Sequence, residues 1–192
     1  LRRLIDALGD RFRFRVITIA TPDEMQLGWG EAFGHERASV RKGISGLAQQ
    51  WRLIRDTRYD LALHNSFFDP QLTIAVLLMR KLRLIPRRPT VVAPRGEFNP
   101  GALQLKSPRK RAYLKVARWL GLLDDVHLQA TDEREAEAVR RTLPAARSIL
   151  IAPNIRSTEP VPRHEPRSPG EPLRIVFLSR IDPMKNLDVA LD

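Results

Sequence analysis

Short apolar segments alternate with segments of helical periodicity along most of this 192-residue chain. Apolar, β-branched segments predict strands, which we place at residues 14–20, 60–65, 90–93, 126–130 and 148–151. Apolar residues spaced three and four apart predict helices, which we place at 2–8, 47–55, 71–84, 110–122 and 132–143. This alternation predicts an α/β fold, with a largely parallel sheet flanked by helices. Residues 21–44 contain several glycines and are expected to be irregular.

A proline-rich segment divides the chain. Residues 156–172 contain five prolines and no periodic pattern, which is typical of a semi-rigid linker. We therefore expect one domain at 1–155 and the start of a second domain at 173–192, where a strand and then a helix begin. The chain opens on a helical pattern without a methionine, so we expect the natural N-terminus to lie upstream of Leu1.

The composition argues against several kinds of site. Cysteine is absent, and the four histidines lack the local spacing of a zinc site, so we expect neither a metal nor a cofactor. The glycine-rich or serine-centred motifs of NTPases, dehydrogenases and hydrolases do not occur. No apolar run has the length of a membrane span. The absence of cysteine fits a cytoplasmic protein.

The positive charge is concentrated in one block. Residues 80–118 hold 12 Lys and Arg with Glu97 as the single acid, so this block carries the whole net charge of +11. Such a block indicates an anionic partner, namely lipid, a phosphorylated ligand or nucleic acid. Within it, residues 109–122 form a basic amphipathic helix, with Tyr113, Val116, Ala117 and Leu120 on one face. On another face, Arg111, Lys115 and Arg118 are candidates to meet a membrane, or they are simply solvated.

Polar residues follow two of the predicted strands directly. Asn65 and Ser66 come after the strand at 60–65, and Arg95, Gly96 and Glu97 come after the strand at 90–93. In open parallel sheets, ligands bind beyond the carboxyl ends of the strands, and Gly96 allows close approach of the backbone. These five residues are candidates for a ligand site. The alternatives are a tight turn with an Arg95–Glu97 ion pair and, for the neighbouring His64, a structural hydrogen bond.

Two cations lie in a loop near the C-terminal end. Arg180 follows an apolar run, and Lys185 lies five residues later, where a helical pattern starts. A helix N-terminus with flanking cations attracts phosphate, through free backbone N–H groups and opposite charge. The alternative is an ordinary strand-to-helix connection with solvated charges.

Several blocks, in the right order, resemble one known family. The stretch Ser179 to Asn186 resembles the Gly-Arg-x4-Lys-Gly loop of glycosyl transferases group 1, the family 4 retaining enzymes with the GT-B fold. The block Pro94-Arg-Gly-Glu-Phe-Asn-Pro-Gly-Ala-Leu103 resembles the Pro-Arg-Gly-Glu-x-x-x-Gly-Ala-Leu block of family members in bacterial surface-polysaccharide synthesis. His64-Asn-Ser-Phe-Phe68, Ala130-Thr-Asp-Glu-Arg-Glu135 and Pro153-Asn154 resemble further family segments. Many relatives have His-Gly where this chain has Arg95-Gly96.

The resemblance implies a Rossmann-like N-terminal domain, on the acceptor side of a two-domain enzyme. That enzyme would transfer a sugar from a nucleotide-sugar, without a metal, to a glycan or lipid-linked acceptor. Arg180 and Lys185 would hold the donor diphosphate; Asn65, Ser66, Arg95, Gly96 and Glu97 would line the acceptor side. The chain alone is expected to be inactive, and the enzyme to be cytoplasmic, peripheral on the inner face of the membrane. Two alternatives from other classes use the 80–118 block: a nucleic-acid-binding module and a non-catalytic membrane-docking module.

Overall fold

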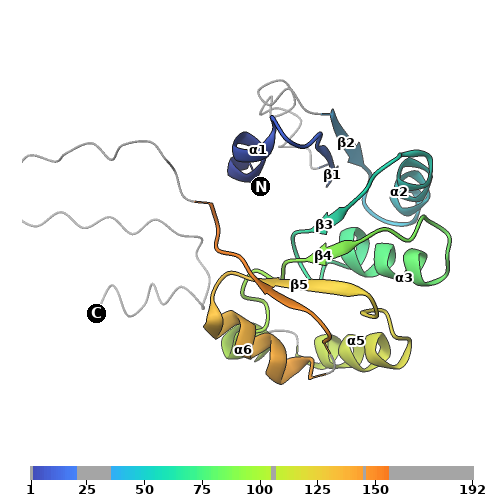
Figure 1. Ribbon diagram of the computed structural model, residues 1–192. Coiled ribbons are helices and arrows are strands. Elements are labelled where there is room, and N and C mark those ends of the chain that lie inside the picture. Colours follow the sequence, from blue (N-terminus) through green and yellow to red (C-terminus); the bar gives the residue numbers. More distant parts are fainter. Residues whose placement is uncertain (1, 21–35, 105–106, 145, 156–192) are drawn as a thin grey trace, which may run out of the picture. The chain divides into compact units, whose positions relative to one another are not determined.

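The computed structural model describes residues 2–20, 36–104, 107–144 and 146–155. The chain divides into two units, Leu1–Ile155 and Arg156–Asp192, and the second lies outside the described residues. The described part is an α/β fold in which parallel strands are flanked by helices (Figure 1). This confirms the predicted fold class and is consistent with a Rossmann-like fold. The predicted linker at 156–172 and the second domain at 173–192 stay predictions.

Four parallel strands form the larger sheet, in the order β3-β4-β5-β6. They are β3 (Ala62–His64), β4 (Thr90–Val92), β5 (Val126–Ala130) and β6 (Ile149–Ile151). Each of the four segments was predicted as a strand. One row of the register runs through His64, Val92, Leu128 and Ile149. Because each strand is added on the same side of the previous one, right-handed crossovers place the connecting helices on one face.

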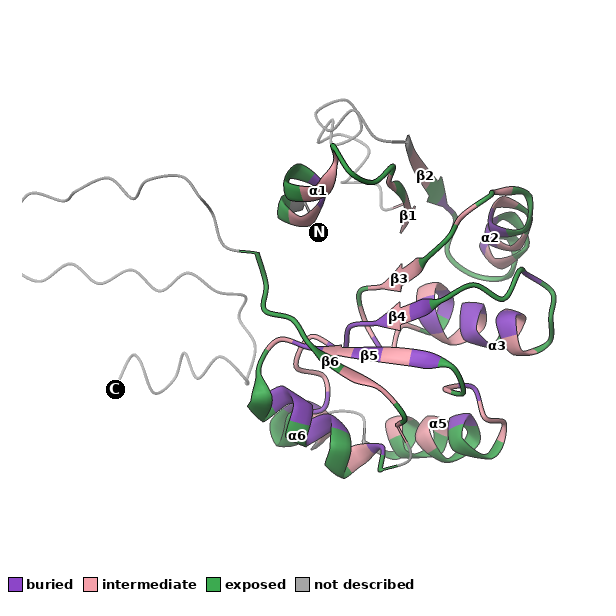
Figure 2. Ribbon diagram, viewed as in Figure 1, coloured by how far each residue is buried: buried purple, intermediate pink, exposed green. Residues whose placement is uncertain are grey.

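The main core lies between this sheet and those helices. The helices are α3 (Ala75–Lys81), α5 (Ser107–Trp119) and α6 (Glu133–Thr142). Leu77 of α3 and Val139 of α6 are buried in the same cluster as Val92 and Leu128, and Tyr113 of α5 packs against it. The alternation is clearest in β5, where Val126, Leu128 and Ala130 are buried and the residues between them are only half-buried (Figure 2).

A second, two-stranded sheet corrects the sequence analysis. β1 (Arg15–Ile19) was predicted, but β2 (Glu36–Val40) lies in the stretch expected to be irregular. β2 pairs with β1 in parallel from Arg15↔Glu36 to Ile19↔Val40. Its sequence, Glu-Arg-Ala-Ser-Val, has only two apolar residues, so its strand conformation follows from pairing with β1 rather than from an apolar pattern. The chain starts with α1 (Arg2–Leu8), as predicted.

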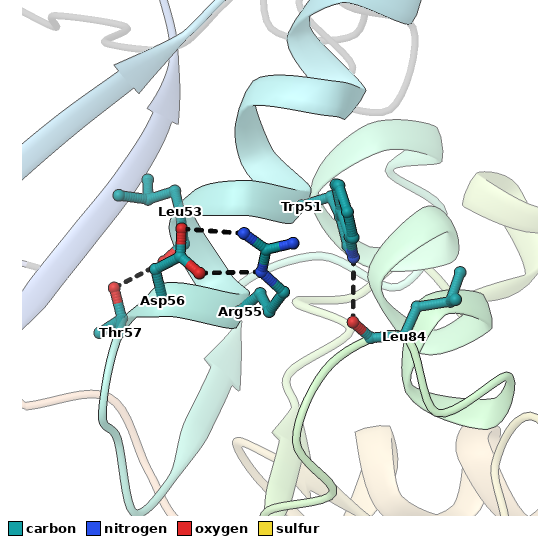
Figure 3. Close-up of polar contacts among 6 residues, drawn as sticks. All are labelled: Trp51, Leu53, Arg55, Asp56, Thr57 and Leu84. Carbon is teal, nitrogen blue, oxygen red and sulfur yellow. Dashed lines mark hydrogen bonds and ion pairs between the residues drawn. The ribbon is translucent and has the colours of Figure 1, made fainter.

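Helix α2 (Ile44–Asp56) joins the second sheet to the first. Ile54 of α2 is packed with Val76 and Ile85, and Ile17 of β1 lies against this cluster. The Trp51 indole donates to the Leu84 carbonyl oxygen at 2.9 Å, which fastens α2 to the segment after α3 (Figure 3). Arg55 lies over the Trp51 ring, 4.6 Å from its centroid, and also pairs with Asp56.

Two further elements differ from the prediction. The helix expected at 71–84 is a π-helix, η1 (Pro70–Ile74), followed by α3. Asp69 caps η1, because its carboxylate accepts from the backbone N–H groups of Gln71 and Leu72. A short helix, α4 (Pro100–Gln104), lies in a stretch in which the sequence indicated only a turn. Five residues are too few for a periodic signal.

Candidate functional site

A polar cavity lies at the carboxyl edge of the four-stranded sheet. Its volume is about 400 Å³, and its lining comes from the segments after β4, β5 and β6. The lining residues are Arg95, Gly96, Asn99, Thr131, Asp132, Arg134, Glu135 and Asn154. Because parallel strands end at the same edge, residues up to 59 positions apart in sequence meet here.

Arg95 crosses this edge of the sheet. Its Nε donates to Asn65 Oδ1 at 2.8 Å, and its Nη1 donates to Asn154 Oδ1. Asn65 follows β3 and Asn154 follows β6, so the guanidinium links the segments that follow the first and the last strand of this sheet. Both partners are neutral amides, which leaves the positive charge of Arg95 uncompensated by these two bonds. Arg95 therefore contacts two amides, in place of the ion pair with Glu97 that the sequence left as an alternative.

The backbone at this point is left-handed. Arg95 has φ 53° and Gly96 has φ 79°. A non-glycine residue at positive φ is uncommon and is retained where the surroundings determine it. Here the Gly96 N–H donates to Glu135 Oε1 at 2.5 Å, which fixes the turn against α6. The positive φ of Arg95 directs its side chain along the edge of the sheet, toward Asn65 and Asn154.

Glu97 and Ser66 contact each other. Ser66 Oγ donates to Glu97 Oε1 at 2.8 Å, and the N–H groups of Phe67 and Phe68 donate to Glu97 Oε2 at 2.5 and 3.2 Å. Glu97 thus fastens the loop after β3 to the loop after β4. The structure brings Arg95 and Gly96 into the cavity wall, whereas Asn65 contacts Arg95 and the Ser66–Glu97 pair is not among the lining residues. The predicted contact of these residues with an acceptor stays a prediction.

Sequence reasoning missed Glu135 as a site residue. The Asp132–Glu135 spacing indicated a capping box, and Asp132 does cap α6, because its Oδ1 accepts from the Glu135 N–H at 2.8 Å. The Glu135 carboxylate, however, accepts from Thr131 N and Thr131 Oγ, both at 2.7 Å, and from Gly96. Glu135 is only 5% exposed, and these three donors stabilise its buried carboxylate.

His64 is a structural histidine in this arrangement. Its Nδ1 lies 2.8 Å from the Leu72 carbonyl oxygen, so Nδ1 carries a hydrogen and donates to that oxygen. Burial lowers the pKa of His64, although the Leu72 contact and the nearby Asp69 charge act in the opposite direction. Its Nε2 is buried and has no partner among the described residues. The neutral ring therefore fastens β3 to η1.

An aromatic cluster lies beneath the Ser66–Glu97 contact. Phe67 packs edge-on against Phe98 and Tyr113, with ring centroids 4.7 and 5.7 Å apart. Lys110 Nζ lies over Phe68, 4.9 Å from its ring centroid. Burial raises the pKa of Tyr113 to about 12, so its hydroxyl stays protonated at neutral pH. These rings give the two polar loops a rigid base.

The predicted basic residues of α5 lie on the protein surface. Arg111, Lys115 and Arg118 are exposed. Ala117 is fully buried and Tyr113 packs on the core, as their shared face predicted. Val116 was assigned to the same face, but it is 48% exposed. It shares an arc of the helix with these residues, but it lies at the margin of that arc, away from the core.

Three further predictions concern the C-terminal loop, metal binding and membrane spans. Arg180 and Lys185 lie outside the described residues. Within the described ranges, no group of three His, Asp or Glu side chains could hold a metal ion. Among the same residues, no helix is long and apolar enough to cross a membrane.

Comparisons with protein-family models, curated proteins and solved structures found no match to this chain. The function is therefore argued from the site. The cavity offers the side chains of Arg95 and Arg134, the amides of Asn99 and Asn154, the hydroxyl of Thr131 and the carboxylates of Asp132 and Glu135, which accept from N–H groups. Guanidinium groups bind phosphate or carboxylate, and amides and hydroxyls exchange hydrogen bonds with sugar hydroxyls. Such a set suits a hydroxyl-rich ligand, with Arg95 and Arg134 as the groups that could bind an anionic part of it.

Proposed function

We propose that this chain contains the acceptor-side domain of a retaining, metal-independent GT-B glycosyltransferase. The enzyme takes a nucleotide-sugar as donor and a glycan or lipid-linked acceptor in surface-polysaccharide synthesis. The observation that carries the proposal is the cavity at the carboxyl edge of β4, β5 and β6, with Arg95 held across it. The motif blocks that resemble the family supply Arg95, Gly96, Thr131, Asp132, Glu135 and Asn154, six of the eight lining residues; Asn99 and Arg134 fall at variable positions of the family blocks.

In this proposal, Arg95 and Arg134 attract a negatively charged group of the acceptor, and Asn99 and Asn154 orient its hydroxyls. Arg180 and Lys185 neutralise the leaving diphosphate of the donor, an interaction that strengthens as charge develops in the transition state. Glu97 and Glu135 position the walls of the cavity and do not react.

The test of acceptor binding uses backbone amide signals in a nuclear magnetic resonance titration with sugar phosphates. We expect the signals of Gly96, Thr131 and Glu135 to shift with added sugar phosphate, and to shift less with the uncharged sugar. Arg95→Ala is expected to weaken the binding roughly tenfold, because a charge-assisted hydrogen bond contributes about 1.5–3 kcal/mol. Arg147→Ala, which removes an exposed arginine outside the cavity, is the matched control. Signals that do not respond to any sugar phosphate would contradict the acceptor role.

The reaction is tested by measuring sugar transfer from a panel of nucleotide-sugars by the full-length enzyme that contains this chain. The variants Arg180→Ala and Lys185→Ala are compared with the unchanged enzyme. We expect both variants to lower kcat by at least about tenfold while the fold is retained, since each removes a charge from the leaving diphosphate. Undiminished turnover in both variants would contradict the role proposed for this loop.

A further inference from the structure

The outer face of α5 carries exposed apolar side chains beside a row of cations. The helix sequence, Ser-Pro-Arg-Lys-Arg-Ala-Tyr-Leu-Lys-Val-Ala-Arg-Trp, contains no acid. At 100° per residue, Ala112, Val116 and Trp119 lie together on the outward side. The exposed basic residues Arg111, Lys115 and Arg118 lie along one side of this strip, and Arg109 lies on the other side.

The inner face of the same helix fixes this orientation. Ala117 is fully buried, and Tyr113 and Leu114 pack against the main core. The helix cannot rotate to bury Trp119 without exposing these residues. Trp119 is 83% exposed and Val116 is 48% exposed, so the outward apolar strip is a stable feature of the folded unit.

The arrangement of charge distinguishes between anionic partners. A protein surface that binds a nucleic acid backbone has its cations in the centre of the contact, where they neutralise the phosphates. A lipid surface is met by an apolar strip that enters the headgroup region, with Lys and Arg at its margins and Trp at the boundary between apolar and polar regions. The described face of α5 has the second arrangement, with the indole of Trp119 on the strip and the cations beside it.

We propose that the outer face of α5 docks on an anionic phospholipid bilayer. Trp119 and Val116 enter the headgroup region, while Lys115 and Arg118 lie over lipid phosphates. The docking surface is built by residues other than those of the cavity, so it stands independently of the glycosyltransferase proposal.

The test measures partitioning of the full chain onto vesicles of phosphatidylglycerol and phosphatidylcholine by co-sedimentation. Each basic residue near an anionic surface contributes roughly a fivefold change in partitioning, so Lys115→Ala with Arg118→Ala is expected to weaken it about 30-fold. The matched control is Arg87→Ala with Arg88→Ala, which removes the same charge from exposed positions of the 80–118 block. The control is expected to change partitioning by less than about threefold.

Insertion is tested by Trp119→Ala, which removes an exposed side chain and is expected to leave thermal unfolding unchanged. We expect partitioning to fall roughly tenfold, through the lost apolar contact. The unchanged protein should show a blue shift of tryptophan fluorescence on the anionic vesicles, and the variant should not. An equal loss of partitioning in the control double variant would overturn the proposal. So would an unshifted fluorescence with vesicles combined with tight binding to a random oligonucleotide, which would indicate a nucleic-acid surface.

Discussion

At the scale of single residues, two carboxylates hold the segments around the cavity together. Glu97 holds three donors of the loop around Ser66, and Glu135 holds three donors from two other segments. Glu135 is buried and Glu97 is half-buried, and the three donors of each replace the water that the carboxylate loses on folding. The walls of the cavity are therefore fixed before any ligand binds, which lowers the entropy lost on binding.

Replacement of Glu135 by Gln tests this role. The amide has one acceptor oxygen where the carboxylate has two, so one of the donors at Gly96 and Thr131 loses its partner. We expect the free energy of unfolding to fall by about 1–3 kcal/mol, measured by urea denaturation. Glu137→Gln, on an exposed position of the same helix, should change it by less than about 0.5 kcal/mol. An equal effect of the two substitutions would contradict the role given to Glu135.

At the scale of elements, α6 shows how local signals place a helix at the site. Asp132 caps the helix, acidic residues (Glu133 and Glu135) lie in its first turn, and basic residues (Arg140 and Arg141) lie in its last turn. This distribution complements the helix dipole, so the sequence itself favours a helix that starts beside the cavity. The position of Thr131 and Asp132 in the cavity wall follows from that start.

The cap can be tested by comparing Asp132→Ala with Asp132→Asn. Alanine removes the oxygen that accepts from the Glu135 N–H, and we expect a loss of about 1 kcal/mol in the free energy of unfolding. Asparagine keeps an acceptor oxygen, so it should retain most of that stability. Thermal unfolding followed by circular dichroism measures both. A midpoint unaffected by Asp132→Ala would show that the cap contributes nothing.

At the scale of the whole folded unit, stability should depend on pH through His64. Its pKa is lowered by burial, so the unfolded chain takes up a proton at a higher pH than the folded chain does. The contribution of His64 to the free energy of unfolding is therefore fully present above about pH 6.5, the ordinary pKa of histidine. This contribution is lost as the pH falls below that value. His64→Asn keeps a donor that reaches toward the Leu72 carbonyl and removes the titration. We expect the urea midpoint of the unchanged protein to fall between pH 7 and pH 5, and that of the variant to fall less.

The sequence by itself determined the class of fold and the place of most elements. In the part of the chain that the structure describes, each strand of the larger sheet and each helix of more than five residues has a local sequence pattern, because apolar periodicity is set by which face of an element is buried. The same patterns placed Arg95 and Gly96 after a strand, and so at the edge where parallel sheets bind ligands. Short elements such as β2 and α4 left no such pattern.

Only the tertiary structure decided which of these residues act together. Arg95 contacts Asn65, 30 positions away, and Asn154, 59 positions away, and Glu135 contacts Gly96, 39 positions away. Such contacts depend on strand order and register, which no local pattern encodes. The capping motif at Asp132 predicted a helix start, but the long-range partner of Glu135 could be identified only after β4 and β5 were paired. Likewise, the exposure of Trp119 follows from which face of α5 the core buries.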